Sequence, residues 1–449
     1  MKPVYLTGAV RTPIGRFGGS LASWTAADLG TAVAKESLKR ANLRPDQVDD
    51  SIWGCARQAG GGPNVARQIT FRAGVPDRIP AFTVNQACGS GLRAIILAAE
   101  QIMLGRANIV LAGGTESISR VPYFAEGARW GTRMGHADLV DGMYHDGFND
   151  PLSGLVMGET AEELARRYEI ARDEQDEYAL RSQQRAMAAI AMGKFGYEIL
   201  PLELNGAARN SVSPWERAGV RGEATAATTP HPNPLPKGEG KSNGVLFATD
   251  EHVRAKTTIE DLRKLSPVFA KDGTITAGNS SGITDGAAAV VMMSEEAVKK
   301  SGVEPLARIV DYEIIGVPPE IMGIGPVPAT RSVLERQQLS LVDIDVIELN
   351  EAFAAQVIAC DRDLQFDHDR LNVNGGAIAL GHPIGCTGVR ITTTLVHEMK
   401  RRKAKRGLAT LCISGGMGIA LLVESVWVWR AANHVAHQTH RRVAFPKWP

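Results

Sequence analysis

The chain has 449 residues, of which 44% are hydrophobic and 22% charged, and its formal net charge is +1. This length accommodates two or three domain-sized units, and the near-neutral charge excludes the concentrated basic face of a nucleic-acid-binding protein. No apolar run approaches the ~20 residues of a membrane-spanning helix, no signal-peptide pattern is present, and the five cysteines lack metal-ligand spacing. We therefore expect a cytoplasmic protein without a bound metal, a membrane partner or a nucleic-acid partner.

Short β-branched strands alternate with Ala-rich helices, and glycine clusters separate them, which indicates an α/β fold in layers. The first clear unit opens with a strand at 82–85 and turns through glycines at 89–91. A helix is predicted from about Leu92, and a second strand at 109–112 ends in Gly113-Gly114.

A different region follows, which we predict to be an inserted, mostly helical lobe. A long helix opens at Met157 and continues, with one break, to about Gly193. Thr160 and Glu163 have the spacing of a capping box at its start. The segment 205–244 is rich in Pro, Gly, Ala and Thr without periodicity, and we expect a flexible excursion that does no chemistry.

The pattern of the first unit recurs near the end of the chain. A short strand is predicted at 373–374, a helix opens at 387–390, and a strand at 409–412 ends near Gly415-Gly416. The matching Val-Asn, Gly-(Leu/Val)-Arg and Gly-Gly landmarks favour an internal duplication over coincidence. The tail 427–449 is irregular and is expected to be poorly ordered.

Cys88 lies between a predicted strand and a glycine-rich turn into a helix. Backbone N–H groups and the helix dipole at such a position favour a thiolate, and the flanking glycines admit a substrate carbonyl. A buried, small apolar cysteine is the alternative interpretation. The context favours a nucleophile.

His382 and Cys412 are the other candidates for chemistry. His382 lies between glycine and proline in a loop of the second unit, where a general base or an oxyanion donor is favoured over an exposed loop histidine. Cys412 ends a strand before a glycine turn, and in a duplicated fold it would face Cys88 from the opposite strand end. Metal ligation and a redox pair remain open, although no CxxC spacing or fourth ligand is evident.

Asn350 follows the apolar residues Val346-Ile347 and is predicted to begin a helix with Glu351. An N-cap is one interpretation of an asparagine at this position. A role in holding a water at the site is compatible with it.

Together these motifs resemble the thiolase family, which includes acetyl-CoA acetyltransferases and 3-oxoacyl-CoA thiolases. The resemblance runs in order from about Lys2 to Ser425, and the excursion interrupts it. It rests on the segments AVRTPIGRFGG, NQACGSGL, MGETAEELA, AGNSSGITDGAAAV, NEAFA, GGAIALGHPIG and CISGGMG.

The resemblance implies a role for each matching residue. Cys88 corresponds to the nucleophile that carries the acyl thioester, His382 to its base, and Cys412 to the acid/base at the α-carbon of acetyl-CoA. Asn350 corresponds to the residue that holds an oxyanion water, and the backbone N–H groups of Cys88 and Ser414 to a second oxyanion hole. The residues that correspond to contacts with coenzyme A (CoA) are Ser281 and Met157.

The resemblance also implies the thiolase fold: two duplicated α/β halves in five α-β-α-β-α layers, with an inserted loop domain. The expected N-terminal half is 1–118, completed by about 284–298. The CoA-binding lobe is 119–283 and the C-terminal half 299–426. The expected partners are acyl-CoA and CoA, with CoA a substrate and no cofactor, in a homodimer or homotetramer.

Two positions depart from the family pattern. Ser414 stands where glycine is usual, and Cys386 stands near His382 where Ala or Ser is usual. The expected activity is reversible thiolytic cleavage of a 3-oxoacyl-CoA, with acetoacetyl-CoA favoured. A non-catalytic acyl-CoA-binding scaffold and a ketoacyl-synthase-type condensing enzyme are the alternatives, and Cys412 argues against the second.

Overall fold

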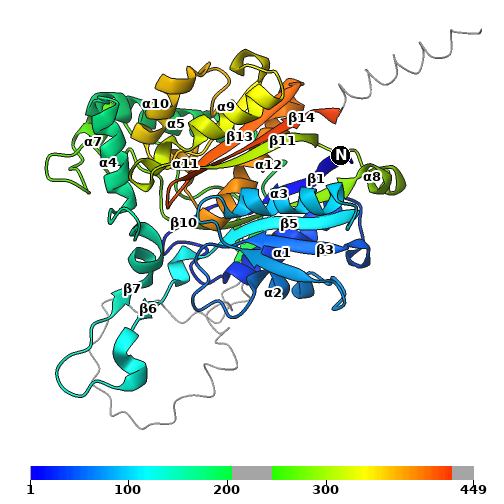
Figure 1. The fold of residues 1–449 in the computed structure, drawn as a ribbon, viewed down its shortest axis with the longest axis horizontal. Coiled ribbons are helices and arrows are strands. Elements are labelled where there is room, and N and C mark those ends of the chain that lie inside the picture. The colour runs from blue at the N-terminus through cyan, green and yellow to red at the C-terminus, as the bar shows by residue number, and fades with distance from the viewer. Residues whose placement is uncertain (1, 205–244, 427–449) are drawn as a thin grey trace, which may run out of the picture.

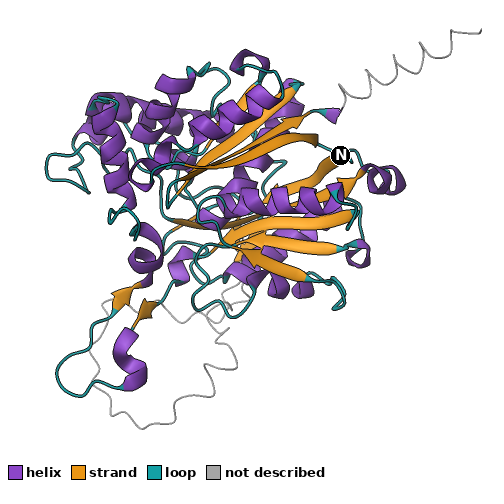
Figure 2. Ribbon diagram, in the orientation of Figure 1, coloured by secondary structure: helices purple, strands orange, loops and turns teal. Residues whose placement is uncertain are grey.

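The protein is described by a computed structural model over residues 2–204 and 245–426. The predicted excursion 205–244 and the tail 427–449 lie outside the described residues. Figure 1 shows two stacked groups of strands with helices above, between and below them, and Figure 2 shows the same layers by secondary structure. This arrangement confirms the predicted five-layered α/β fold.

The strands of these two groups form one mixed sheet, because β1 pairs with β11 through Tyr5–Arg308 and Leu6–Ala307. The short strand β2 (Gly15–Arg16) pairs with β10 beside the main path. The order along that path is β12 (Val346–Leu349), β13 (Arg406–Ile413), β14 (Met417–Glu424), β11 (Ala307–Gly316), β1 (Val4–Arg11), β10 (Thr284–Ser294), β5 (Ile109–Glu116), β3 (Asp50–Gly54) and β4 (Ala81–Val84).

The central layer consists of α3 (Ser90–Met103) and α12 (Ile384–Arg402), which lie between the two groups of strands in Figure 1. The two helices meet at glycines: a Cβ atom on Gly388 would overlap the backbone of Leu92, and one on Gly91 would lie 2.8 Å from the carbonyl oxygen of Gly385. Gly91 and Gly388 belong to the matching Gly-(Leu/Val)-Arg landmarks, so the two copies pack through equivalent positions.

The outer helices cover the remaining faces of the sheet. Because β10 is covered on both sides, all of its residues are buried, as expected for a strand inside a layered fold. The N-terminal strands are covered by α1 (Ala26–Arg40) and α2 (Val65–Arg72), and the C-terminal strands by α4 (Met157–Arg167), α5 (Arg172–Ala191), α9 (Pro326–Arg336) and α10 (Ala354–Leu364).

Smaller strands and helices lie outside the main sheet and the long helices. They are the paired strands β6 (Tyr123–Phe124) and β7 (Val140–Asp141), the paired strands β8 (Leu202–Leu204) and β9 (Val245–Phe247), and the short helices α7 (Ile259–Arg263), α8 (Glu295–Ser301) and α11 (Ala377–Leu380). Among the described residues, no helix combines the length and the apolar character needed to cross a membrane.

The predicted strand at 373–374 is wrong. Only Leu371 forms a bridge there, to Ile347. Asn372 adopts a left-handed φ of +46° and its amide bonds the backbone of Leu349, so the chain turns away from the sheet before Asn374. The Gly-Gly landmark also fails, because Gly113-Gly114 lie inside β5 whereas Gly415-Gly416 follow the end of β13.

The helix from Met157 with one break is confirmed by α4 and α5, but the capping box is misplaced. Glu159 accepts from the backbone N–H of Val156 at 2.7 Å. Thr160 lies within the helix and donates to the carbonyl of Met157. The side-chain cap therefore lies one turn before the predicted capping box.

Candidate active site

Cys88 lies in a tight turn between the end of β4 and the start of α3. Ala87 has a φ of +44°, a conformation that residues with a Cβ atom seldom adopt. The Ser90 hydroxyl stabilises the turn, because it accepts from the N–H of Gln86 at 2.8 Å and donates to the carbonyl of Ala87 at 2.7 Å. The turn directs the thiol of Cys88 into a cavity.

The prediction that Cys88 favours the thiolate is wrong for the free protein. Burial raises the pKa of the Cys88 thiol, and this effect exceeds the lowering by Arg57 and by hydrogen bonds from the backbones of Ser414 and Cys88. Backbone N–H groups therefore favour the thiolate as predicted, but burial outweighs them. Deprotonation of Cys88 needs a base at the moment of reaction.

His382 provides a suitable base. Its Nδ1 lies 2.6 Å from the hydroxyl of Thr387, and that hydroxyl donates to the carbonyl of Pro383 at 3.0 Å. Since the hydroxyl has one hydrogen, Nδ1 carries the imidazole proton and Nε2 keeps a free lone pair. Nε2 has no partner among the described residues, and burial lowers the His382 pKa to about 3, so the ring is neutral at pH 7.

Cys412 and Ser414 approach the cavity from the C-terminal half. Cys412 lies near the end of β13 and its side chain is fully buried. Burial raises its pKa well above the ordinary value, and the charge of a Cys88 thiolate would raise it further. Ser414 needs no left-handed φ, because the turn uses Gly415 and Gly416 for this purpose, so serine fits where the family pattern has glycine.

Asn350 does not begin a helix, because α10 starts four residues later at Ala354. The predicted N-cap role is therefore wrong. The Asn350 side chain is 1% exposed, and neither its oxygen nor its nitrogen has a hydrogen-bond partner among the described residues. An unpaired buried amide is destabilising, which favours a functional reason for its presence.

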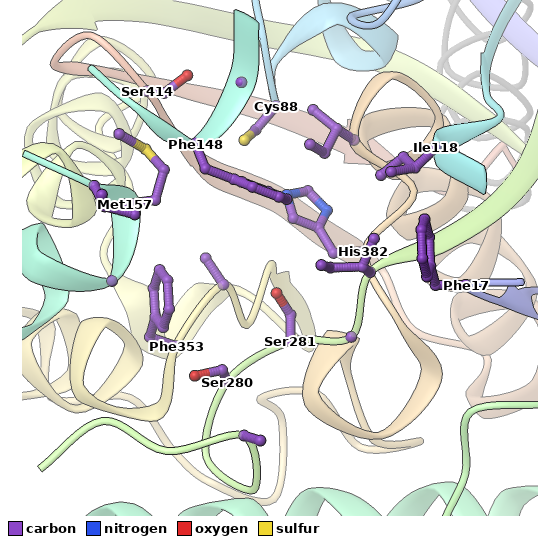
Figure 3. A pocket seen from close by; sticks show the side chains of 18 of the residues that line it. Phe17, Cys88, Ile118, Phe148, Met157, Ser280, Ser281, Phe353, His382 and Ser414 are labelled. Atoms are coloured by element: carbon purple, nitrogen blue, oxygen red, sulfur yellow. The ribbon is translucent and has the colours of Figure 1, made fainter. Parts of the chain in front are cut away.

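One cavity of about 490 Å³ unites most of the predicted residues. Figure 3 shows Cys88 and Ser414 at one side of it, His382 at its centre, and Met157 and Ser281 along its walls. Cys412 also contacts the cavity, whereas Asn350 does not belong to its lining. Cys386, near His382 in sequence, is buried in the central core instead, as the small-residue interpretation implies.

Sequence reasoning missed the positive side chains around this cavity. Arg16, Arg57 and Arg254 line it beside His252, whose pKa burial lowers to about 4, and no aspartate or glutamate among the described residues does so. A cationic cavity of this size suits an anionic ligand. Arg57 follows the end of β3 after two residues, as Cys88 follows β4 after a short turn. A charged residue beside a strand end was the signal that could have identified it.

A half-buried thiol, a neutral imidazole with a free Nε2 and a second, buried thiol thus line one cavity of a duplicated α/β fold. This combination defines the class of enzymes that transfer acyl groups through a cysteine thioester.

Comparisons with known proteins give the family. Residues 4–228 and 232–296 match the model of the thiolase N-terminal domain, and residues 303–425 match that of the thiolase C-terminal domain. The chain belongs to the thiolase family, as the sequence motifs predict.

The matches to relatives cover nearly the full length of both chains. An acetyl-CoA acetyltransferase of Syntrophomonas wolfei is 47% identical over 95% of this chain and 100% of its own, and one of Pseudomonas aeruginosa is 48% identical over 94% and 99%. The crystal structure of the Bacillus anthracis acetyl-CoA acetyltransferase superimposes with a TM-score of 0.84 at 44% identity, covering 95% of this chain and 99% of that one. Human mitochondrial 3-ketoacyl-CoA thiolase in complex with CoA gives 0.84 at 42%, covering 94% and 98%.

Proposed function

We propose that this protein is an acetyl-CoA acetyltransferase that cleaves a 3-oxoacyl-CoA, with acetoacetyl-CoA favoured, or condenses two acyl-CoA molecules in reverse. The observation that carries the proposal is the meeting of Cys88, His382 and Cys412 around one cavity. The acetyl-CoA acetyltransferases that match over their full lengths support it.

The cleavage half of the reaction assigns one proton transfer to each group. His382 Nε2 takes the proton of Cys88 as the sulfur attacks the 3-oxo carbon, because a thiol with a raised pKa needs a base in concert. The bond between the α- and β-carbons then breaks and leaves an acyl thioester on Cys88. Cys412 donates its proton to the α-carbon of the departing enolate, which becomes acetyl-CoA.

The second half returns the enzyme to its starting state. The thiol of CoA gives its proton to the Cys412 thiolate and attacks the thioester carbonyl. The bond between the carbonyl carbon and the Cys88 sulfur then breaks and releases the shortened acyl-CoA, and His382 Nε2 returns its proton to Cys88. The backbone N–H groups of Cys88 and Ser414, which lower the pKa of the Cys88 thiol, are suited to the oxyanion of this step. The protonated Nε2 of His382 and a water held by Asn350 are suited to the enolate oxygen, since the Asn350 amide has unused hydrogen-bonding groups.

CoA is a substrate in this scheme, and no cofactor takes part. We assign its binding to the lobe 119–283, because Met157, His252, Arg254 and Ser281 line the cavity from that part of the chain. The same proposal divides the rest into an N-terminal half, 1–118 with 284–298, and a C-terminal half, 299–426.

A cytoplasmic homodimer or homotetramer completes the proposal. All five cysteines are free thiols, which suits a reducing compartment. The strand β4 forms one end of the sheet, and its Phe82 is 40% exposed, so a second chain has an edge to pair with. Light scattering coupled to size-exclusion chromatography measures the assembly directly.

The decisive experiment follows the loss of acetoacetyl-CoA absorbance after CoA is added, for wild type and Cys88→Ala. We expect turnover in the wild type and none in the variant. A folded wild type that cleaves neither acetoacetyl-CoA nor a longer 3-oxoacyl-CoA would contradict the proposal and favour an acyl-CoA-binding scaffold.

A further inference from the structure

A buried carboxylate outside this reaction scheme joins three segments next to the cavity. Glu116 ends β5 and its side chain is fully buried. One oxygen accepts from the backbone N–H of Arg57 at 3.0 Å, and the other from those of Ala56 at 3.1 Å and Gly385 at 2.8 Å. The thiol of Cys55 lies 3.6 Å from the first oxygen. Both oxygens are therefore used to hold backbone that is distant in sequence.

One of these bonds completes the start of helix α12. The residue before the helix is Pro383, whose side chain cannot cap it, and the first N–H groups of any helix lack partners inside it. The Glu116 carboxylate supplies the missing acceptor at Gly385 from another part of the fold. A carboxylate at this end of a helix is also favoured by the helix dipole.

The same turn of chain fixes His382. Its backbone N–H donates to the carbonyl of Gly282 at 2.9 Å, and its ring is oriented by Thr387 in the first turns of α12. Gly385 lies between these two residues. A movement of the start of α12 would therefore displace the imidazole of His382, because Thr387 belongs to the helix that Glu116 caps.

The backbone around Gly385 is closely packed against the backbone of two other segments. A Cβ atom on Gly385 would lie 2.8 Å from the Cα of Cys55 and 2.8 Å from the carbonyl oxygen of Thr115. Backbone thus meets backbone here, and Glu116 provides the hydrogen bonds that such a contact otherwise lacks. Its partner loop carries Arg57, which lines the cavity with Cys88.

We propose that Glu116 is a positioning residue that holds His382 and the Arg57 loop in register with Cys88 by capping α12 from the N-terminal half. The inference rests on the proposed function for its kinetic consequence only. Its structural basis is that the carboxylate at the end of β5 accepts hydrogen bonds from both the Arg57 loop and the start of α12.

Glu116→Gln tests the proposal, because glutamine keeps one accepting oxygen and places an NH₂ group against N–H donors at the other. We expect kcat for acetoacetyl-CoA cleavage to fall about 10²-fold, as for a displacement of order 1 Å in a catalytic group, with KM within about threefold. Asp49→Ala is the matched control: Asp49 accepts from the N–H groups of Asn108 and Ile109 at the other end of β5. This control should lose stability but keep kcat.

A second measurement separates positioning from general damage and does not depend on thiolase activity. The rate of Cys88 alkylation by iodoacetamide is measured in wild type, Glu116→Gln, His382→Ala and the double variant. We expect Glu116→Gln to change the rate at least about fivefold alone and less than about twofold beside His382→Ala, since coupled residues are non-additive. An equal effect in both backgrounds would show that Glu116 does not act through His382.

Other outcomes also decide the matter. Unchanged kcat in folded Glu116→Gln, or an equal loss in Asp49→Ala, would overturn the proposal. Glu116→Asp repeats the test if the glutamine variant does not fold, and we expect an intermediate kcat because its carboxylate is one methylene too short to reach all three amides. Failure of both variants to fold, with Asp49→Ala folded, would assign Glu116 to folding alone. A wild type without thiolase activity leaves the alkylation test valid.

Discussion

Asn350 carries an amide that is buried and unpaired, whereas the amide of Asn372 is equally buried and fully paired. Replacing an unpaired polar group by an apolar one of similar shape is close to neutral for folding or stabilising, but breaking a satisfied one costs about 1–3 kcal/mol. We predict that Asn350→Leu keeps the free energy of unfolding and lowers kcat about 10²-fold, the scale of one oxyanion donor. Asn372→Leu is the control and should unfold more easily. Denaturant titration with kinetics measures both, and a strongly destabilised Asn350→Leu would contradict the functional interpretation.

His382 should make stability depend on pH in the acid range. Its folded pKa of about 3 lies below the ordinary value of 6.5, so below pH 6.5 the unfolded chain binds a proton that the folded protein does not. The contribution of His382 to the free energy of unfolding is therefore fully present above pH 6.5. It is lost as the pH falls toward 3, by about 1.4 kcal/mol per pH unit. Relative to His382→Gln, the wild type should lose stability along this slope in urea titrations from pH 7 to 4. Parallel curves would contradict a buried neutral imidazole.

The residue types of the site were predictable, but their partners were not. Cys88, His382 and Cys412 stand beside glycines in the sequence, and this local signal suffices to identify them. The role of Glu116 depends on its hydrogen bonds to backbone amides near residues 56 and 385. The role of Thr387 depends on how the His382 ring is oriented. The sign of the Cys88 pKa shift depends on burial, which the turn sequence alone does not contain.

At the scale of elements, the crossing of α3 and α12 should tolerate no side chain at its glycines. Gly388→Ala would place a methyl group against the backbone of Leu92, and overpacking of this kind costs about 1–3 kcal/mol. Gly127→Ala is the control, because nothing lies within 4 Å of the added atom. The midpoint of thermal unfolding should fall for Gly388→Ala but not for Gly127→Ala. An unchanged midpoint for Gly388→Ala would mean that α3 and α12 can move apart without a loss of stability.

The elements themselves were predictable where their period was strong. The helices α4 and α5 and the strands β5 and β13 follow from alternating or helical patterns. The strand expected at 373–374 failed because the side-chain hydrogen bonds of Asn372 compete with regular structure, and the helix expected at Asn350 begins only at Ala354. Asn372 bonds the neighbouring strand end, and a polar residue after a strand does not show where the next helix begins.

At the scale of the whole molecule, the two residues that flank the segment 205–244 lie side by side. Leu204 and Val245 are paired neighbours on the antiparallel strands β8 and β9, so a two-residue Asn-Gly turn is long enough to connect them. We predict that replacing 205–244 by Asn-Gly leaves the unfolding midpoint, CoA affinity and kcat near their wild-type values. Calorimetry and steady-state kinetics measure these quantities, and weaker CoA binding would show that the excursion has a role.

The position of β10 between β1 and β5 bears on how the chain is made. A ribosome completes β1 and β5 by residue 116, but the strand that joins them begins only at Thr284. During this interval each of the two strands has an open edge, which favours pairing with other chains. The N-terminal half therefore cannot close until most of the chain has emerged, and nascent chains of this protein should depend on chaperones until β10 is synthesised.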